Sequence, residues 1–81
     1  MSNRYEIAYP LKGATVSAKL FREGVLIEDA GVLNEGAGNT EYIYYKVSSV
    51  GWINGDDIVY YDSGVPIGAE TFEDFQFVRD G

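Results

Sequence analysis

The fold of this chain is decided by the stretch Ala14-Thr15-Val16-Ser17-Ala18-Lys19-Leu20-Phe21, in which apolar and polar side chains alternate. Successive side chains of a β-strand point to opposite sides of a sheet. The period of two therefore predicts a strand with Ala14, Val16, Ala18 and Leu20 in a core and Thr15, Ser17 and Lys19 in solvent. Arg22-Glu23-Gly24 then predicts a tight turn, because Gly24 tolerates the positive φ of a short hairpin loop. We expect a hairpin whose second strand begins at Val25.

Outward from this hairpin, short segments of similar character recur, separated by Gly, Asn, Asp or Pro. Residues 40–47 are rich in the β-branched and aromatic residues that strands favour. Pro66 restricts residues 65–69 to a sheet edge or a bulge, because proline has no backbone donor for a ladder. The other segments expected to be extended are 5–9, 57–62 and 71–79, the last with a bulge near Glu73-Asp74.

The glycine-rich stretch Glu35-Gly36-Ala37-Gly38-Asn39 predicts a flexible loop, since these residues do not favour regular structure. With seven or eight short strands and no helix, the chain is expected to form one all-β domain over residues 1–81. The number and spacing of the strands favour a small immunoglobulin-like β-sandwich. A small SH3-like or OB-type barrel is the alternative, because short strands and Gly-rich turns suit it equally.

The composition argues against some classes of binding partner. Six Lys and Arg against thirteen Asp and Glu give a net charge of −7, and the basic residues are scattered, so we expect no nucleic-acid binding. No apolar run approaches the roughly 18 residues of a membrane span, and the first residues lack the apolar stretch of a signal peptide. We expect no membrane partner. An 81-residue chain has a small core, so association with copies of itself or with a larger assembly is a natural source of extra stability.

The sequence has few of the residues that catalytic and metal sites usually use. The chain has no His and no Cys, which removes the common nucleophilic and zinc sites, and we expect neither an enzyme nor a cofactor. A pair of carboxylates could still cleave a glycoside, but so short a chain leaves little room for a cleft. Asp56, Asp57 and Asp62 offer oxygen ligands that suit calcium. Their spacing is not that of an EF-hand, and Asn54-Gly55-Asp56 also predicts a turn, so we assign no metal ligand.

The aromatic content, 15% of the chain, exceeds what a small core needs. We expect Tyr45, Tyr60, Phe75 and Phe77 to point inward. Alternation then places Tyr42, Tyr44 and Tyr61 outward, where with Trp52 they would form an interaction surface. Such rings also stack on sugars, so a carbohydrate- or ligand-binding module is an alternative function. Two structural interpretations remain open: the tyrosines reinforce the sheet as cross-strand pairs, and Trp52 closes the end of the sandwich.

Two stretches, 13–25 and 55–64, resemble modules of tailed-bacteriophage virion proteins and related immunoglobulin-like sandwiches. In those modules a strand like the first turns into its partner, and a Gly-Asp entry with a Tyr-rich strand, here Gly55-Asp56 and Tyr60-Tyr61, comes late in the fold. The chain departs from antibody-type domains in lacking both cysteines. The resemblance implies a non-catalytic structural protein of the virion, made in the host cytoplasm: a capsid decoration, a head-tail component or a tail component. Its partners would be copies of itself, other virion proteins or both.

Overall fold

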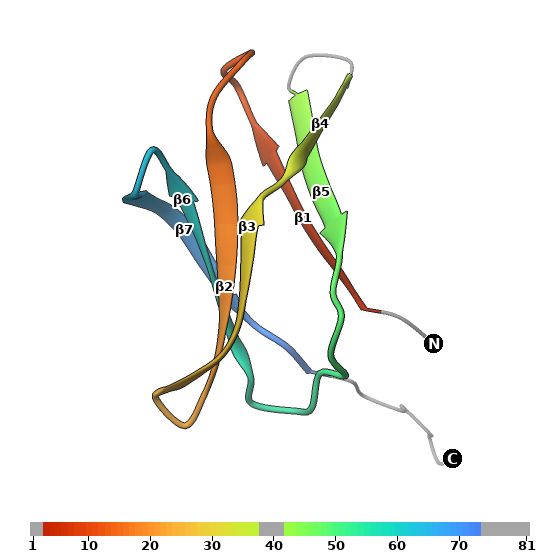
Figure 1. Cartoon of the computed structure of the whole chain (residues 1–81), viewed down its shortest axis with the longest axis vertical. Coiled ribbons are helices and arrows are strands. Elements are labelled where there is room, and N and C mark those ends of the chain that lie inside the picture. The colour runs from red at the N-terminus through yellow and green to blue at the C-terminus, as the bar shows by residue number, and fades with distance from the viewer. Residues whose placement is uncertain (1–2, 38–41, 74–81) are drawn as a thin grey trace, which may run out of the picture.

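The computed structural model describes residues 3–37 and 42–73 and places them in two antiparallel sheets that pack face to face (Figure 1). One sheet has three strands in the order β1-β5-β4, and the other has four in the order β3-β2-β6-β7. The bounds of the strands are β1 Arg4–Tyr9, β2 Val16–Arg22, β3 Val25–Val32, β4 Asn34–Ala37, β5 Tyr42–Val47, β6 Asp57–Asp62 and β7 Val65–Thr71. The described residues contain no helix, and the predicted small β-sandwich is confirmed.

Two hairpins build most of the four-stranded sheet. The β2–β3 turn has positive φ at Glu23 (53°) and Gly24 (81°), and the β6–β7 turn repeats this at Ser63 (53°) and Gly64 (86°). Two consecutive residues with positive φ are typical of a type I′ turn, whose twist matches that of the flanking strands. The turn predicted at Arg22-Glu23-Gly24 is therefore confirmed.

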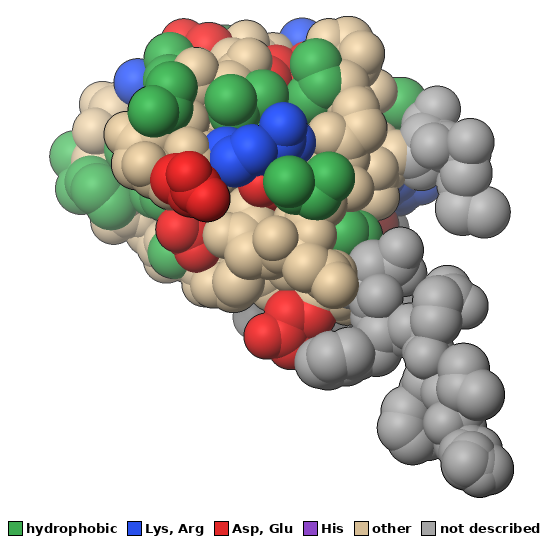
Figure 2. Space-filling view, turned by 90° about the horizontal axis from the view of Figure 1, so that it is seen from below, with side chains coloured by type: hydrophobic (Ala, Val, Ile, Leu, Met, Phe, Trp, Pro, Cys, Tyr) green, Lys and Arg blue, Asp and Glu red, His purple; other side chains and the backbone are tan. Residues whose placement is uncertain are grey.

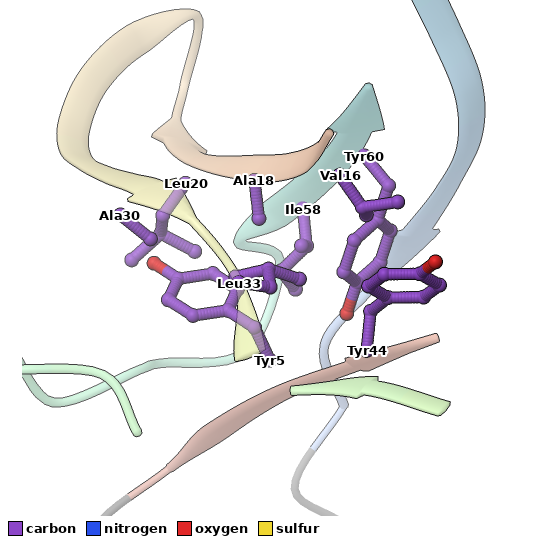
Figure 3. Close-up of a cluster of buried hydrophobic side chains, with 9 residues drawn as sticks. All are labelled: Tyr5, Val16, Ala18, Leu20, Ala30, Leu33, Tyr44, Ile58 and Tyr60. Atoms are coloured by element: carbon purple, nitrogen blue, oxygen red, sulfur yellow. The ribbon is translucent and has the colours of Figure 1, made fainter. Parts of the chain in front are cut away.

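The core lies between the two sheets (Figure 3). The even-numbered residues of β2, Val16, Ala18 and Leu20, are fully buried, as the alternation predicts. Ile58 and Tyr60 of β6 lie beside them, because Leu20 pairs with Ile58 and Ala18 with Tyr60. From the three-stranded sheet the buried side chains are those of Tyr5 and Tyr44. Alternation on β2 and β6 thus supplies most of one wall of the core.

The order of the strands is immunoglobulin-like. When β1 is matched to strand B of that fold, the sheets read B-E-D and C′-C-F-G. The chain passes from β3 to β4, and so from one sheet to the other, through the single residue Leu33. Leu33 is buried, and its N–H donates a 2.7 Å hydrogen bond to the carbonyl of Val16. One continuous piece of chain therefore forms an edge of both sheets.

Several expectations about single segments are corrected or confirmed. The loop predicted at Glu35-Gly36-Ala37 is wrong, because these residues belong to β4 and pair with β5 from Tyr42 to Tyr44. Pro66 does lie on an edge strand, and the register shifts next to its partner Tyr61. The prediction that Pro66 lies at a sheet edge or a bulge is therefore confirmed. Of the segment 71–79 expected to be extended, Thr71 ends β7 and residues 72–73 are not part of a strand. Residues 74–79, including Asp74 of the expected bulge, Phe75 and Phe77, lie outside the described residues.

The orientation predicted for β5 is also wrong. Tyr44 is buried and Tyr45 lies on the outer side, the reverse of what we expected. The Tyr44 hydroxyl donates a 2.6 Å hydrogen bond to the Leu11 carbonyl and accepts one from the Ala14 N–H at 3.2 Å. These contacts attach the β1–β2 connection to the core. On the outer side, the Arg4 guanidinium lies 4.7 Å from the centre of the Tyr45 ring.

Figure 2 shows the molecule from below, where acidic, basic and hydrophobic side chains lie side by side. An ion pair joins Arg22, at the end of β2, to Asp56 in the β5–β6 connection. The Arg22 guanidinium donates to both carboxylate oxygens of Asp56, at 2.8 and 2.9 Å, and Asp56 is fully buried. The same carboxylate accepts a hydrogen bond from the Ile53 N–H, and Arg22 donates a further one to the Gly51 carbonyl. The Arg22 hydrogen bond holds the pKa of Asp56 below its ordinary value, although burial opposes this. The pair fixes the β5–β6 connection against β2.

Candidate interaction surface

The four residues expected to form an interaction surface do not lie together. Tyr44 is in the core, so its outward placement is wrong. Tyr42 shares the inner face of β5 with Tyr44 and is half-buried against the core cluster, so its predicted outward placement is wrong as well. Tyr61 is half-buried on the outer face of the other sheet, and Trp52 lies in the β5–β6 connection. The structure therefore does not assemble Tyr42, Tyr44, Tyr61 and Trp52 into one site.

Trp52 closes the end of the sandwich, which is one of its two predicted roles. The other role placed it in an interaction surface. Its ring lies 4.9 Å from that of Tyr5 and 5.5 Å from that of Phe72, measured between centroids. The indole N–H donates a 2.9 Å hydrogen bond to the Ser48 hydroxyl. Both the ring and its polar atom are thus engaged within the chain, which leaves little of Trp52 to receive a ligand.

Glu28 accepts several hydrogen bonds at this end of the molecule. Its carboxylate accepts from the hydroxyls of Tyr5 (2.7 Å), Ser48 (2.6 Å) and Ser49, and from the Ser49 N–H at 3.0 Å. Burial favours the neutral acid, but these donors favour the carboxylate and bring the pKa of Glu28 down to about 2. The group acts as a structural anchor that joins β3 to β1 and to the β5–β6 connection.

Acid is expected to weaken the fold through Glu28. Its pKa of about 2 in the folded chain lies below its ordinary value of 4.5, so its contribution is complete above pH 4.5 and is lost as the pH falls toward 2. Thermal unfolding followed by Trp52 fluorescence should show the melting temperature decreasing over that range. Glu28→Gln should melt lower at pH 7 and lose part of the decrease. Exposed Glu35→Gln is the control, and an equal slope in all three proteins would contradict the role of Glu28.

The acidic residues considered for calcium do not converge. Asp56 is paired with Arg22, whereas Asp57 accepts a 2.9 Å hydrogen bond from the Thr71 hydroxyl. Asp62 lies at the far end of β6, about 17 Å along the strand from Asp57, and accepts hydrogen bonds from Tyr9 and Ser63. Within residues 3–37 and 42–73, no three Asp, Glu, His or Cys side chains come close enough to hold a metal ion.

The outer face of the four-stranded sheet exposes several apolar side chains. Side chains of directly paired residues share a face, so Ser17, Lys19 and Phe21 define three rows across the sheet. The rows, read from β3 to β7, are Val32-Ser17-Tyr61-Pro66, Asp29-Lys19-Val59-Ala69 and Leu26-Phe21-Asp57-Thr71. Val32 and Leu26 are exposed, while Phe21 and Val59 are half-buried. Seven of these twelve side chains are apolar or aromatic.

This outer face has a hollow and a defined arrangement of charge. A depression of about 380 Å³, next to the β2–β3 turn, is lined by Phe21, Gly24, Asp57, Val59, Ala69, Glu70 and Thr71. At the centre of the face the Lys19 ammonium lies 5.2 Å from the centre of the Tyr61 ring. We define the outer face as these three rows. It offers an apolar floor, one cation held on an aromatic ring, and two carboxylates, Asp29 and Asp57.

The alternation that predicts the core also contains the signal for this face, although we placed no interaction residue there except Tyr61. Phe21 follows Lys19 by two, and Val59 precedes Tyr61 by two, so both lie on the side opposite the core. What the sequence does not provide is the pairing of β2 with β6, which brings Phe21, Val59 and Tyr61 onto neighbouring strands.

Comparisons with known proteins contribute no relative. The chain matches no protein-family model, and neither the curated proteins nor the solved structures include a match. No helix among the described residues has the length and hydropathy to cross a membrane. The interpretation of function therefore depends on the surface itself.

Proposed function

We propose that the protein is a non-catalytic interaction module that docks on a protein partner through the outer face of its four-stranded sheet. The observation that supports this most is the apolar character of that face, where Leu26 and Val32 are exposed on β3 and Phe21 and Val59 are half-buried on the two middle strands. Contiguous exposed apolar surface is uncommon on a monomer and is typical of sites that bind other proteins.

We further propose that the partner is a structural protein of a tailed-bacteriophage virion, with this chain as a capsid decoration, head-tail or tail component. The support is the resemblance of residues 13–25 and 55–64, which fall on β2 with its turn and on β6. These strands carry the middle of the outer face. The sandwich would act as a rigid scaffold that presents this face and performs no reaction.

The alternative function, binding of carbohydrate, has less support from the arrangement of the rings. Stacking on a sugar requires an accessible ring face, and Tyr44 is buried while Trp52 packs between Tyr5 and Phe72. Tyr61 is on the surface, but the Lys19 ammonium lies over its ring. We therefore favour a protein partner.

Two valines provide a matched test. Val32 on the outer face and Val47 on the three-stranded sheet are both 59% exposed. Particles of a phage that encodes the chain, assembled without it, would be mixed with purified protein and sedimented. We expect wild type and Val47→Glu to sediment with the particles and Val32→Glu to bind at least tenfold more weakly, because a carboxylate would enter an apolar contact.

Two results would count against the proposal. If wild-type protein stays in the supernatant, the virion partner is wrong. If Val32→Glu and Val47→Glu bind equally well, the outer face is not the docking surface. Circular dichroism of each variant would first establish that both remain folded, as expected for exposed positions.

A further inference from the structure

The hollow in the outer face combines an apolar floor with two acidic lining residues, Asp57 and Glu70. Phe21, Val59 and Ala69 come from three neighbouring strands, and Asp57 stands between Phe21 and Thr71 in the adjoining row. Its volume of about 380 Å³ is within the range of sites that take small ligands or single side chains. Leu26 extends the apolar surface from Phe21 toward the sheet edge.

Three cationic side chains of the described residues are engaged elsewhere. Arg22 is bound to Asp56, and the Lys46 ammonium donates a 2.6 Å hydrogen bond to the Ala30 carbonyl. Lys19 lies over Tyr61, also on the outer face. Asp57, by contrast, accepts a hydrogen bond from the neutral hydroxyl of Thr71 and forms no ion pair with any residue in 3–37 or 42–73. No residue in 3–37 or 42–73 supplies a cation to Asp57, so a partner can supply one.

We infer that the hollow receives an apolar side chain from a protein segment that carries Lys or Arg beside it, and that this cation pairs with Asp57. The inference rests on the proposed function and specifies the chemistry of the partner. A net charge of −7 attracts such a segment and repels a second copy of the chain. The apolar contact supplies affinity, and the pair with Asp57 selects basic over acidic segments.

The test uses two synthetic hexapeptides, one alternating leucine and lysine and one alternating leucine and glutamate. Each would be titrated into isotopically labelled protein while backbone amide shifts are followed by NMR. We expect the lysine peptide to give saturable shifts at Phe21, Val59 and Ala69, weakening as salt is added, and the glutamate peptide to give none. Ala69→Leu, which fills the hollow, should weaken binding at least tenfold.

Asp57→Asn is the specific variant, because asparagine keeps an oxygen that can accept from Thr71 and removes the charge. This variant should bind the lysine peptide about fivefold more weakly than wild type does. Glu35→Gln on the three-stranded sheet is the matched control, since Glu35 also accepts one hydrogen bond, from the Gly13 N–H, and the charge change is the same. We expect no loss of affinity from this control.

Three outcomes would overturn the inference. Shifts spread evenly over both sheets would mean diffuse attraction to an acidic protein. Equal binding of both peptides would remove the role of Asp57. Shifts at the same amides that depend on protein concentration without peptide, and grow with salt, would mean that a second copy covers the hollow. If particles bind Asp57→Asn and Ala69→Leu like wild type but reject Val32→Glu, only this inference fails and the docking function stands.

Discussion

Replacing Arg22 with methionine is expected to lower the free energy of unfolding by about 3 kcal/mol, because the substitution leaves the Asp56 carboxylate buried without its cation. Asp56 is completely shielded from solvent, whereas the Arg22 side chain is 32% exposed. That exposure places the effect at the low end for a broken buried pair. Chemical denaturation with urea, followed by Trp52 fluorescence, measures the change.

Arg4→Met is the matched control for this variant. Arg4 also pairs with a carboxylate, that of Glu6 at 3.2 Å, but both side chains are exposed. Exposed pairs contribute less than about 1 kcal/mol, so Arg4→Met should unfold close to wild type. Equal losses in the two variants would contradict a special role for the Arg22–Asp56 pair. Asp56 titrates in acid with its pKa lowered, so the difference between the variants should also shrink at low pH.

Leu20→Ala is expected to cost about 3 kcal/mol of stability and to lower the melting temperature by roughly 10 to 25 °C. Leu20 lies in the middle of β2, is fully buried, and packs between the two sheets (Figure 3). Truncation to alanine removes its contacts and leaves a cavity. In a chain of this size such a loss is a large fraction of the total stability.

Leu26→Ala provides the comparison for Leu20. Leu26 pairs with Phe21 on the adjacent strand but is 48% exposed, so its truncation should change stability by less than about 1 kcal/mol. Differential scanning calorimetry of the two alanine variants measures both effects under one set of conditions. If Leu26→Ala destabilises as much as Leu20→Ala, the assignment of inner and outer faces on β2 and β3 would be wrong.

Local patterns predicted those parts of the fold that depend on neighbouring residues. Alternation placed Val16, Ala18 and Leu20 in the core, and the Gly24 turn formed where expected. Proline chemistry placed Pro66 on an edge strand, where its missing donor is tolerated. In each case the structure at a position is decided by residues that lie close to it in the sequence.

Features that depend on contacts between distant segments were not predictable in the same way. Alternation along β5 is correct, but alternation does not say which of its two faces is inner. The choice depends on Tyr44 reaching Leu11 and Ala14 across the sandwich. Likewise, β4 forms at Glu35-Gly36-Ala37 because β5 offers a partner, which overrides the weak strand preference of glycine.

The candidate site shows the same division. Tyr61 points outward as expected, on the side of β6 opposite buried Tyr60. Trp52, by contrast, packs into the end of the sandwich against Tyr5, Phe72 and the Ser48 hydroxyl. Ser48 is in turn bound to Glu28, twenty residues earlier in the chain. Such a network has no signature in the local sequence.

The single-residue link at Leu33 makes the two sides of the sandwich unequal. On that side the backbone itself ties the sheets together, so they cannot separate there without stretching the chain. On the opposite side β1 and β7 are the free edges, and the contacts that join them across the gap are noncovalent. The Glu6 N–H of β1 donates to the Tyr60 hydroxyl of β6 at 3.0 Å, this hydroxyl donates to the Glu70 carboxylate of β7 at 3.3 Å, and Ile7 lies against Gly68 of β7. The two sheets are therefore joined by the backbone along one side and by noncovalent contacts along the other, and these contacts depend on the Tyr60 hydroxyl.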